Sequence, residues 1–410
     1  MEVGFKNVLS KLVILTFALL LILNMPTVYF KSLDSNYHLD IFLALVSVVV
    51  IIQVLVLATL NKIDLRIPVL VVLIYEILLL SFFMINVHGY KMEFFMTYNF
   101  YVPAFFVVNY LLVKLNRTYI VLEYMSKIVT VLAVVSLIFW FLCSIVHVLN
   151  FNTSVWIDWG QIKQVRSFHN VHFETQAVTL MGRNIIRNTG IFCEAPMYSF
   201  VLVISLFYNL LFNRKKSNIT IFILLVTILT TLSTTGILML LYAFLVMFVY
   251  KKQSQKILIV LKNLLMIIVI PVLVVVGIVF LTMKMQTGSY LTRMDDITGL
   301  IQYWQLHPFV GNGFNSSISN VQSYLSNRRS NNTGLSSGLF VALAESGISL
   351  ILMHSCYVIL AFVSKNKNNI VFSVLLFLLF IVTLVQYRPM YLYLLTFCYA
   401  IFFDKQKENK

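Results

Sequence analysis

Long apolar runs alternate with short polar segments along almost the whole chain. A helix needs about 20 apolar residues to cross a bilayer, and a transmembrane β-barrel needs alternating segments of about ten. The runs here are long and uninterrupted. The pattern therefore predicts an all-α polytopic membrane protein with about twelve transmembrane helices, at residues 9–25, 40–60, 68–86, 98–114, 128–149, 192–212, 219–233, 236–250, 262–283, 336–363, 370–386 and 389–404.

The composition favours one integral membrane domain over residues 1–410. The chain is 60% hydrophobic and 11% charged, whereas soluble domains are about 25% charged. The first run lacks a small-residue cleavage site, so we expect it to be a retained span rather than a signal peptide. Two polar stretches interrupt the pattern, and we predict large outer loops there, at 150–191 and 284–335. The four cysteines lack metal-site spacing, and we expect them to be buried.

The basic residues indicate how the chain crosses the membrane. Their net charge of +15 is spread one to four residues at a time between apolar runs. Such scattering is typical of cytoplasmic loops and argues against nucleic acid as a partner. Twelve spans place both termini on one side. With both termini cytoplasmic, 19 of the 30 Lys and Arg residues lie inside, in agreement with the positive-inside rule.

The segment 219–250 is too short for two full spans and the turn between them. The basic stretches NRKK (213–216) and KKQSQK (251–256) place both of its ends inside. We therefore expect its tip, LSTTG (232–236), to lie within the outer leaflet. Backbone at that depth requires cover from protein or from a water-filled cavity. A plain tight turn between two short spans is the alternative.

Arginine is concentrated on the predicted outer face. Of the 11 outer basic residues, seven are arginines: Arg166, Arg183, Arg187, Arg293, Arg328, Arg329 and Arg388. A guanidinium group grips phosphate with two hydrogen bonds and keeps its charge where solvation is poor. This pattern predicts a site for a phosphate or diphosphate group. Contact with lipid headgroups is the alternative for any single arginine.

The second outer loop contains a helical pattern. Its apolar positions recur at the spacing of one helix face: Ile297, Leu300, Ile301 and Trp304. We expect a helix in the outer interface with Trp304 as its anchor. His307 and Pro308 end this helix, and the two glycines of the following VGNG sequence (310–313) allow a tight turn.

Several short sequences occur in an order typical of one family. HPFVGNGF (307–314) precedes LFVALAESGISLIL (339–352), and RNTGIFCEAPMYSF (187–200) and LSTTG lie upstream. Over residues 180–355 the chain resembles the O-antigen ligase/polymerase superfamily, and it is most similar to a Wzy-type polymerase of O-antigen or capsular repeat units. The resemblance implies a membrane glycosyltransferase of the C-type fold in the bacterial cytoplasmic membrane.

The resemblance also implies a reaction and its partners. Repeat units linked to undecaprenyl diphosphate would be joined on the outer face, and membrane lipid would surround the enzyme. Flippase and chain-length regulator proteins are further candidate partners.

Two alternatives to a polymerase remain. Ligases of the superfamily carry a histidine about nine residues before the Glu of the Glu-x-Gly motif. Here that position, counted from Glu345, is Ser336, which favours a polymerase over a ligase. A flippase or other transporter would be expected to show two similar halves, and the chain shows no internal repeat.

The chemistry suggests roles for individual residues. Fixed cations stabilise a diphosphate leaving group, and Arg187 and Arg293 match the motif arginines of the superfamily. The candidate bases are Glu345 and His307. The candidates for substrate binding are Arg388, Arg183, Arg328, Arg329 and Glu194, of which Glu194 would orient Arg187 or act as a base itself.

The sequence predicts neither a metal nor another cofactor. The chain has no Asp-x-Asp motif in its outer segments, and the adjacent Asp295 and Asp296 cannot easily share one ion. The pair formed by His169 and His172 lacks a third ligand at suitable spacing.

Overall fold

A computed structural model describes most of the chain: residues 2–33, 38–85, 92–180, 183–215, 217–250, 288–314, 316, 320–325, 335 and 337–403. Four of the sequence-based predictions lie outside the described residues, namely those for Arg328, Arg329, Ser336 and the span at 262–283. The backbone of Arg183 is described, but its side chain is not.

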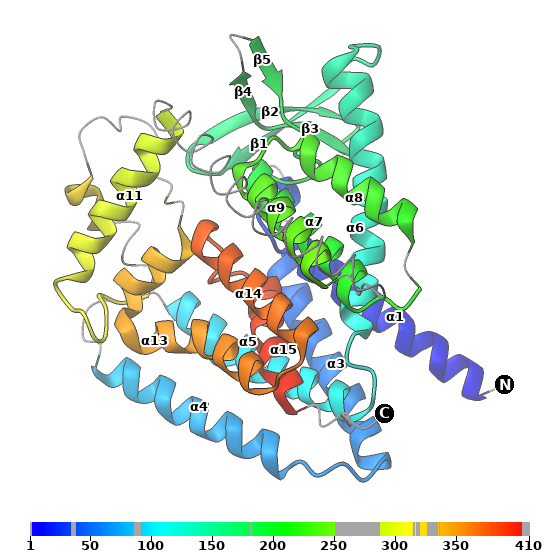
Figure 1. The fold of residues 1–410 in the computed structure, drawn as a ribbon, viewed down its shortest axis with the longest axis vertical. Coiled ribbons are helices and arrows are strands. Elements are labelled where there is room, and N and C mark those ends of the chain that lie inside the picture. Colours follow the sequence, from blue (N-terminus) through cyan, green and yellow to red (C-terminus); the bar gives the residue numbers. More distant parts are fainter. Residues whose placement is uncertain are drawn as a thin grey trace, which may run out of the picture.

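The described part of the chain is mainly helical (Figure 1). Each predicted span within it contains a helix, and two further helices are α2 (Val28–Lys31), in the first predicted connection, and α11, in the second outer loop. These helices are α1 (Glu2–Leu23), α3 (Leu39–Leu60), α4 (Arg66–Ile85), α5 (Met92–Lys114), α6 (Ile120–Phe139), α7 (Ala195–Leu211), α8 (Asn218–Thr230), α9 (Thr234–Tyr250), α11 (Gly288–Trp304), α13 (Gly338–Val363), α14 (Lys367–Val382) and α15 (Pro389–Ala400).

Among the described residues, five helical stretches are long and apolar enough to cross a membrane: Leu39–Leu60, Arg66–Ile85, Phe95–Lys114, Ile120–Ile145 and Gly338–Val363. The other apolar helices are shorter. These features confirm a polytopic helical membrane protein. The total of twelve spans and the C-type glycosyltransferase fold stay predictions.

The helix ends fall into two groups that match the predicted sides. At one side, the amide of Val28 donates to the carbonyl of Ile191 at 2.8 Å, and the amide of Leu33 donates to Trp156 at 2.9 Å. At the other side, Lys114 Nζ donates to the carbonyl of Phe403 at 2.8 Å. The first group contains the ends that charge assigns to the outside, and we call it the outer side.

The first outer loop is folded into strands, so the all-α prediction is incomplete. β1 (Thr153–Asp158), β2 (Ile162–Phe168) and β3 (His172–Glu174) form an antiparallel sheet, and β4 (Ala177–Leu180) pairs with β5 (Arg183–Ile186). In Figure 1 both sheets lie at the opposite end of the molecule from α4. The sequence signal was the alternation in β2, where Val165 and Ser167 are buried between exposed neighbours.

Helix α11 packs against the first turns of α13. Leu300 and Tyr303 are buried there with Val341 and Ala344, so part of the predicted apolar face covers protein. The indole of Trp304 donates to the carbonyl of Pro308 at 2.9 Å. The position of α11 relative to a membrane surface stays a prediction.

Candidate active site

The first feature of the site is the interruption between α8 and α9. Helix α8 has 13 residues, about 20 Å at 1.5 Å per residue, which is short of the roughly 30 Å of the hydrocarbon core. The chain turns at Thr231 and Leu232 before α9 begins. This length supports a turn within the outer leaflet, where carbonyl groups at the end of α8 need partners.

Arg187 supplies those partners. Its Nε donates to the carbonyl of Thr231 at 2.9 Å, and its Nη2 donates to the carbonyl of Leu232 at 3.2 Å. The amide of the next residue, Asn188, donates to the carbonyl of Thr230 at 3.1 Å. A cation at a helix C-terminus also opposes the negative end of the helix dipole. Arg187 is therefore held in one orientation by the backbone of the turn.

Two other charged candidates lie within electrostatic reach of Arg187. Burial lowers the pKa of Arg187 to about 10; the charge of Glu194 opposes this shift, and that of Arg293 adds to it. Arg187 follows β5, whereas Arg293 lies on α11. The fold thus brings together the two arginines that the family resemblance singled out.

The orientation of Arg187 does not depend on an ion pair with Glu194. Both side chains are described, and no ion pair joins them within 4.0 Å, unlike Arg66 with Asp64 or Lys127 with Glu123. Gln176 orients Arg187 instead: its Oε1 accepts from Arg187 Nη1 at 3.3 Å and from the amide of Ala195 at 3.1 Å. Sequence reasoning missed Gln176, because nothing in its local pattern distinguishes it.

Further cations approach the same segment from other parts of the chain. Burial raises the pKa of the Cys193 thiol to about 12, and Glu194 adds to this effect. The charges of Lys163, Lys31 and Arg388 oppose it. These three side chains therefore lie near Cys193, although they belong to β2, to α2 (Val28–Lys31) and to the residue before α15.

Two of these cations face the same pair of aromatic rings. The guanidinium carbon of Arg388 lies 5.9 Å from the ring centre of Phe30 and 5.8 Å from that of Trp159. Lys31 Nζ lies 5.3 Å and 5.8 Å from the same rings. Such contacts hold cations against aromatic faces. We call the assembled set the outer cation cluster: Lys31, Lys163, Arg187, Arg293 and Arg388. The two lysines were not among the predicted site residues.

The second feature is an interruption inside α13 at Gly347, where φ is 63° and ψ is −163°. A continuous helix would join the amides of Ile348 and Ser349 to the carbonyls of Ala344 and Glu345.

The glycine turn (308–313) replaces both bonds. The amides of Asn312 and Gly313 donate to Ala344 and Glu345 at 3.1 and 2.8 Å, and Ile348 and Ser349 donate to Pro308 and Phe309 at 3.1 and 3.3 Å.

This exchange of hydrogen bonds requires glycine at two positions. Gly311 has φ of 71°, and a Cβ there would lie 2.3 Å from the amide nitrogen of Ser346. Gly347 has φ of 63°, and its Cβ would lie 2.4 Å from the carbonyl of Phe309. Only glycine tolerates such backbone and such close approach. The turn motif and the Glu-x-Gly motif are thus two halves of one contact.

His307 directly precedes the glycine turn. Its carbonyl accepts from the amide of Gly311 at 2.8 Å, so its backbone shapes the turn. Its candidacy as a base stays a prediction.

Glu345 lies directly before the interruption and is 1% exposed. The hydroxyl of Tyr387 donates to Glu345 Oε2. Tyr387 precedes Arg388 on the turn between α14 and α15, so one short turn contributes both to the outer cation cluster and to the Glu345 carboxylate. Sequence reasoning missed Tyr387, although its position beside Arg388 was an available signal.

A second set of buried contacts holds the turn that carries Tyr387. The hydroxyl of Tyr98 donates to the carbonyl of Gln386 at 3.1 Å and lies 3.2 Å from His354 Nε2. Because the Tyr98 hydroxyl donates its proton to the carbonyl of Gln386, its oxygen accepts from His354, whose Nε2 is therefore the protonated ring nitrogen. His354 Nδ1 then accepts from Tyr391 at 3.0 Å. These contacts tie α5, α13 and α15 together behind Tyr387.

The remaining candidates are separated. Arg183 opens β5 opposite Leu180 at the tip of a hairpin, about 13 Å along the strand from Arg187 at 3.3 Å per residue. His169 is exposed, whereas His172 is buried, and its burial lowers its pKa to about 4. His172 Nε2 lies 3.2 Å from Ser144 Oγ. The two histidines therefore occupy different environments.

Comparison with known proteins covers part of this site. A family model described as O-antigen ligase matches residues 219–355, which include the α8–α9 turn, α11, the glycine turn and the Glu-x-Gly motif. This match covers about a third of the chain and supports the resemblance to the O-antigen ligase/polymerase superfamily. Members of the superfamily are membrane enzymes that transfer glycosyl groups, and they act on lipid-linked oligosaccharides. No curated protein matches the chain.

Proposed function

We propose that this protein is a polymerase that joins oligosaccharide repeat units carried on undecaprenyl diphosphate at the outer face of the bacterial cytoplasmic membrane. One observation carries the proposal. Lys31 and Arg388 face the same two aromatic rings, Lys163 binds the carbonyl of Thr175 beside the Gln176 that binds Arg187, and the turn that carries Arg388 also binds the buried carboxylate of Glu345.

The outer cation cluster would bind the leaving group. In the reaction, the bond between the sugar C1 and the phosphate oxygen breaks, and its electron pair stays on the diphosphate. Cations that are already fixed in place stabilise this charge without reorganisation. Arg187 fits this role because the α8–α9 turn holds its guanidinium group. The arginines thus supply the positive charge that a divalent metal would otherwise provide.

The acceptor is a hydroxyl group of a second lipid-linked repeat unit. Its oxygen attacks C1 as the diphosphate departs, and its proton passes to a nearby base. We assign that base to the carboxylate of Glu345, which Tyr387 holds in position.

A ligase of the same superfamily is the second candidate, since the matching family model is described as O-antigen ligase. The chain has Ser336 where superfamily ligases carry a histidine, and this difference favours the polymerase. A ligase would use the same diphosphate site but a different acceptor.

Deleting the gene and sizing the surface glycan by gel electrophoresis tests the proposal. A glycan that stops at one repeat unit supports a polymerase. Full-length chains that remain on the carrier lipid indicate a ligase. Loss of all surface glycan with repeat units trapped inside the cell indicates a flippase and contradicts the proposed roles of the arginines.

A further inference from the structure

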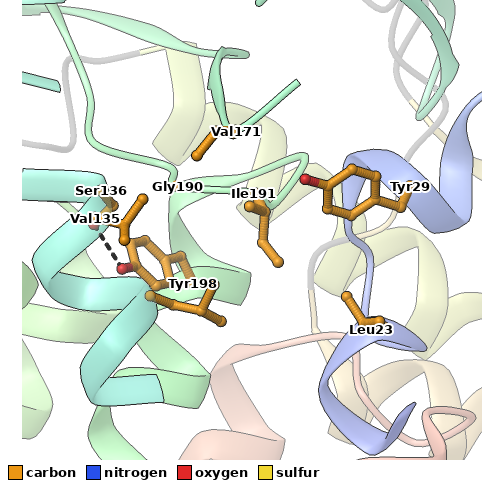
Figure 2. A pocket seen from close by; sticks show the side chains of 9 residues that line it. Leu23, Tyr29, Val135, Ser136, Val171, Gly190, Ile191 and Tyr198 are labelled. Atoms are coloured by element: carbon orange, nitrogen blue, oxygen red, sulfur yellow. Dashed lines mark hydrogen bonds between the residues drawn. The ribbon is translucent and has the colours of Figure 1, made fainter. Parts of the chain in front are cut away.

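An apolar cavity of about 150 Å³ lies beside the site (Figure 2). Its walls come from the end of α1, from α2, from α6, from the turn between β2 and β3, from the segment before α7 and from α7 itself. The residues that matter here are Leu23, Leu132, Val135, Val171, Ile191 and Tyr198. A dry apolar cavity of this size accepts a molecule as large as benzene, which is close in size to one five-carbon isoprene unit.

The same chain segment forms a wall of this cavity and carries the central arginine of the site. Ile191 lines the cavity, and Arg187 lies four residues before it in the chain. Between them, Asn188 Nδ2 donates to Ser136 Oγ at 3.3 Å, and Ser136 Oγ lies 2.8 Å from the hydroxyl of Tyr198. A polar boundary therefore separates the apolar cavity from the cationic groups.

The cavity also adjoins the surface of α6 that faces outward. Leu132 and Val135 line the cavity, whereas Val131, Val134 and Ile138 on the same helix are 63%, 36% and 50% exposed. Apolar side chains exposed on a spanning helix are suited to contact with lipid. An apolar chain in the bilayer thus has a short route along α6 into the cavity.

We propose that this cavity binds the first isoprene unit of the carrier lipid, next to the diphosphate held by the outer cation cluster. The inference rests on the proposed function, which supplies the lipid-linked substrate. An amphiphile with an anionic head and an apolar chain matches the juxtaposition of cations and cavity. The cavity would then place the scissile bond at a fixed distance from Arg187.

Photolabelling of the purified full chain in phospholipid vesicles tests this assignment. The probe is a polyprenyl diphosphate with a diazirine on the isoprene unit nearest the diphosphate. We expect labelled peptides from α6 around Leu132 and Val135, and we expect excess unlabelled polyprenyl diphosphate to suppress the label. Equal suppression by added phospholipid would show that the cavity holds ordinary membrane lipid, and it would overturn the proposal.

Variants provide the matched comparison. Val135→Trp fills the cavity and should lower labelling at least tenfold. Val69→Trp makes the same change on α4, where Val69 is 54% exposed, and should leave labelling unchanged. Val171→Trp is a second cavity variant in a surface turn, where Val171 is 39% exposed, and it retains the test if Val135→Trp does not fold. Unchanged labelling in folded cavity variants contradicts the proposal.

This labelling experiment does not require activity. If the wild-type protein is labelled as expected but makes no polymer from lipid-linked repeat units, the proposed polymerase function fails and the cavity assignment stands. If the wild-type protein makes polymer but folded cavity variants are labelled normally, only the cavity assignment fails.

Discussion

Helical structure is interrupted at two described places on the outer side, between α8 and α9 and inside α13. Both interruptions leave backbone amides or carbonyls without their usual helical hydrogen bonds. At the first, the guanidinium group of Arg187 donates to the carbonyls of Thr231 and Leu232. At the second, the backbone of the glycine turn exchanges hydrogen bonds with residues on both sides of Gly347. In lipid, each unsatisfied backbone group costs several kcal/mol.

The two ways of pairing the backbone groups leave different side chains available for catalysis. A side chain that caps a helix end brings a positive charge to the interruption, so Arg187 can contribute to structure and to an anion site together. Backbone exchange uses no side chain. It leaves the carboxylate of Glu345 to bind Tyr387, and it demands glycine at the contact. Substitutions at the second interruption should therefore affect folding most, and those at the first should affect activity.

Gly311→Ala should have the largest effect, because its Cβ would lie 2.3 Å from the backbone of α13 at a positive φ. The conformation alone costs about 1–2 kcal/mol, and the overlap adds to it. We expect little folded protein by size-exclusion chromatography in detergent. The control is Gly299→Ala on α11, where the nearest atom, at 3.0 Å, is the end of the Leu325 side chain. Normal yield of Gly311→Ala would mean that the two motifs do not depend on each other.

Arg187→Ala should lower polymer formation by about 100-fold or more, as expected on removal of a fixed group that stabilises developing charge. Loss of the bonds to Thr231 and Leu232 should also lower the amount of folded protein, so the measurement is glycan length on gels at matched amounts of folded protein. Polymer formation by Arg187→Lys should lie between that of the wild type and that of Arg187→Ala, since lysine keeps the charge but not the forked geometry of the guanidinium group. Arg166→Ala, an exposed residue of β2, is the control. Full activity of Arg187→Ala would remove Arg187 from the site.

Tyr387→Phe tests whether the second interruption also contributes to catalysis. Loss of the hydroxyl removes the hydrogen bond to Glu345, and we expect roughly a tenfold lower rate because the base is less well placed. Tyr393→Phe is the control on α15, since its buried hydroxyl has no hydrogen-bond partner among the described residues. A wild-type rate in Tyr387→Phe would limit the role of Glu345 to helix packing.

Glu194→Gln should have the smallest effect, about threefold on the rate, because the charge of Glu194 acts on Arg187 from a distance rather than through an ion pair. Initial rates in the same membranes as Arg187→Ala provide the comparison. A loss as large as that of Arg187→Ala would instead identify Glu194 as the base.

Much of the architecture follows from the order of residues alone. Long apolar runs must form helices in lipid, because backbone groups have no other partners there, and helices occupy every predicted span among the described residues. The scattered basic residues assigned each helix end to a side of the membrane, and that orientation stays a prediction. The strands at 153–186 were missed, since their short alternating pattern is much weaker than a run of apolar residues.

For the candidate site, the sequence predicts less and the tertiary structure decides more. Residue types alone predict that arginines gather at the outer ends and that glycines bend the backbone within HPFVGNGF and the Glu-x-Gly motif, because residue type limits charge and backbone conformation. Only the tertiary structure decided that Arg187 caps α8, that the two glycine motifs join and that Tyr387 holds Glu345. Each of these contacts links segments far apart in the chain, and local sequence patterns carry no information about which distant groups will meet.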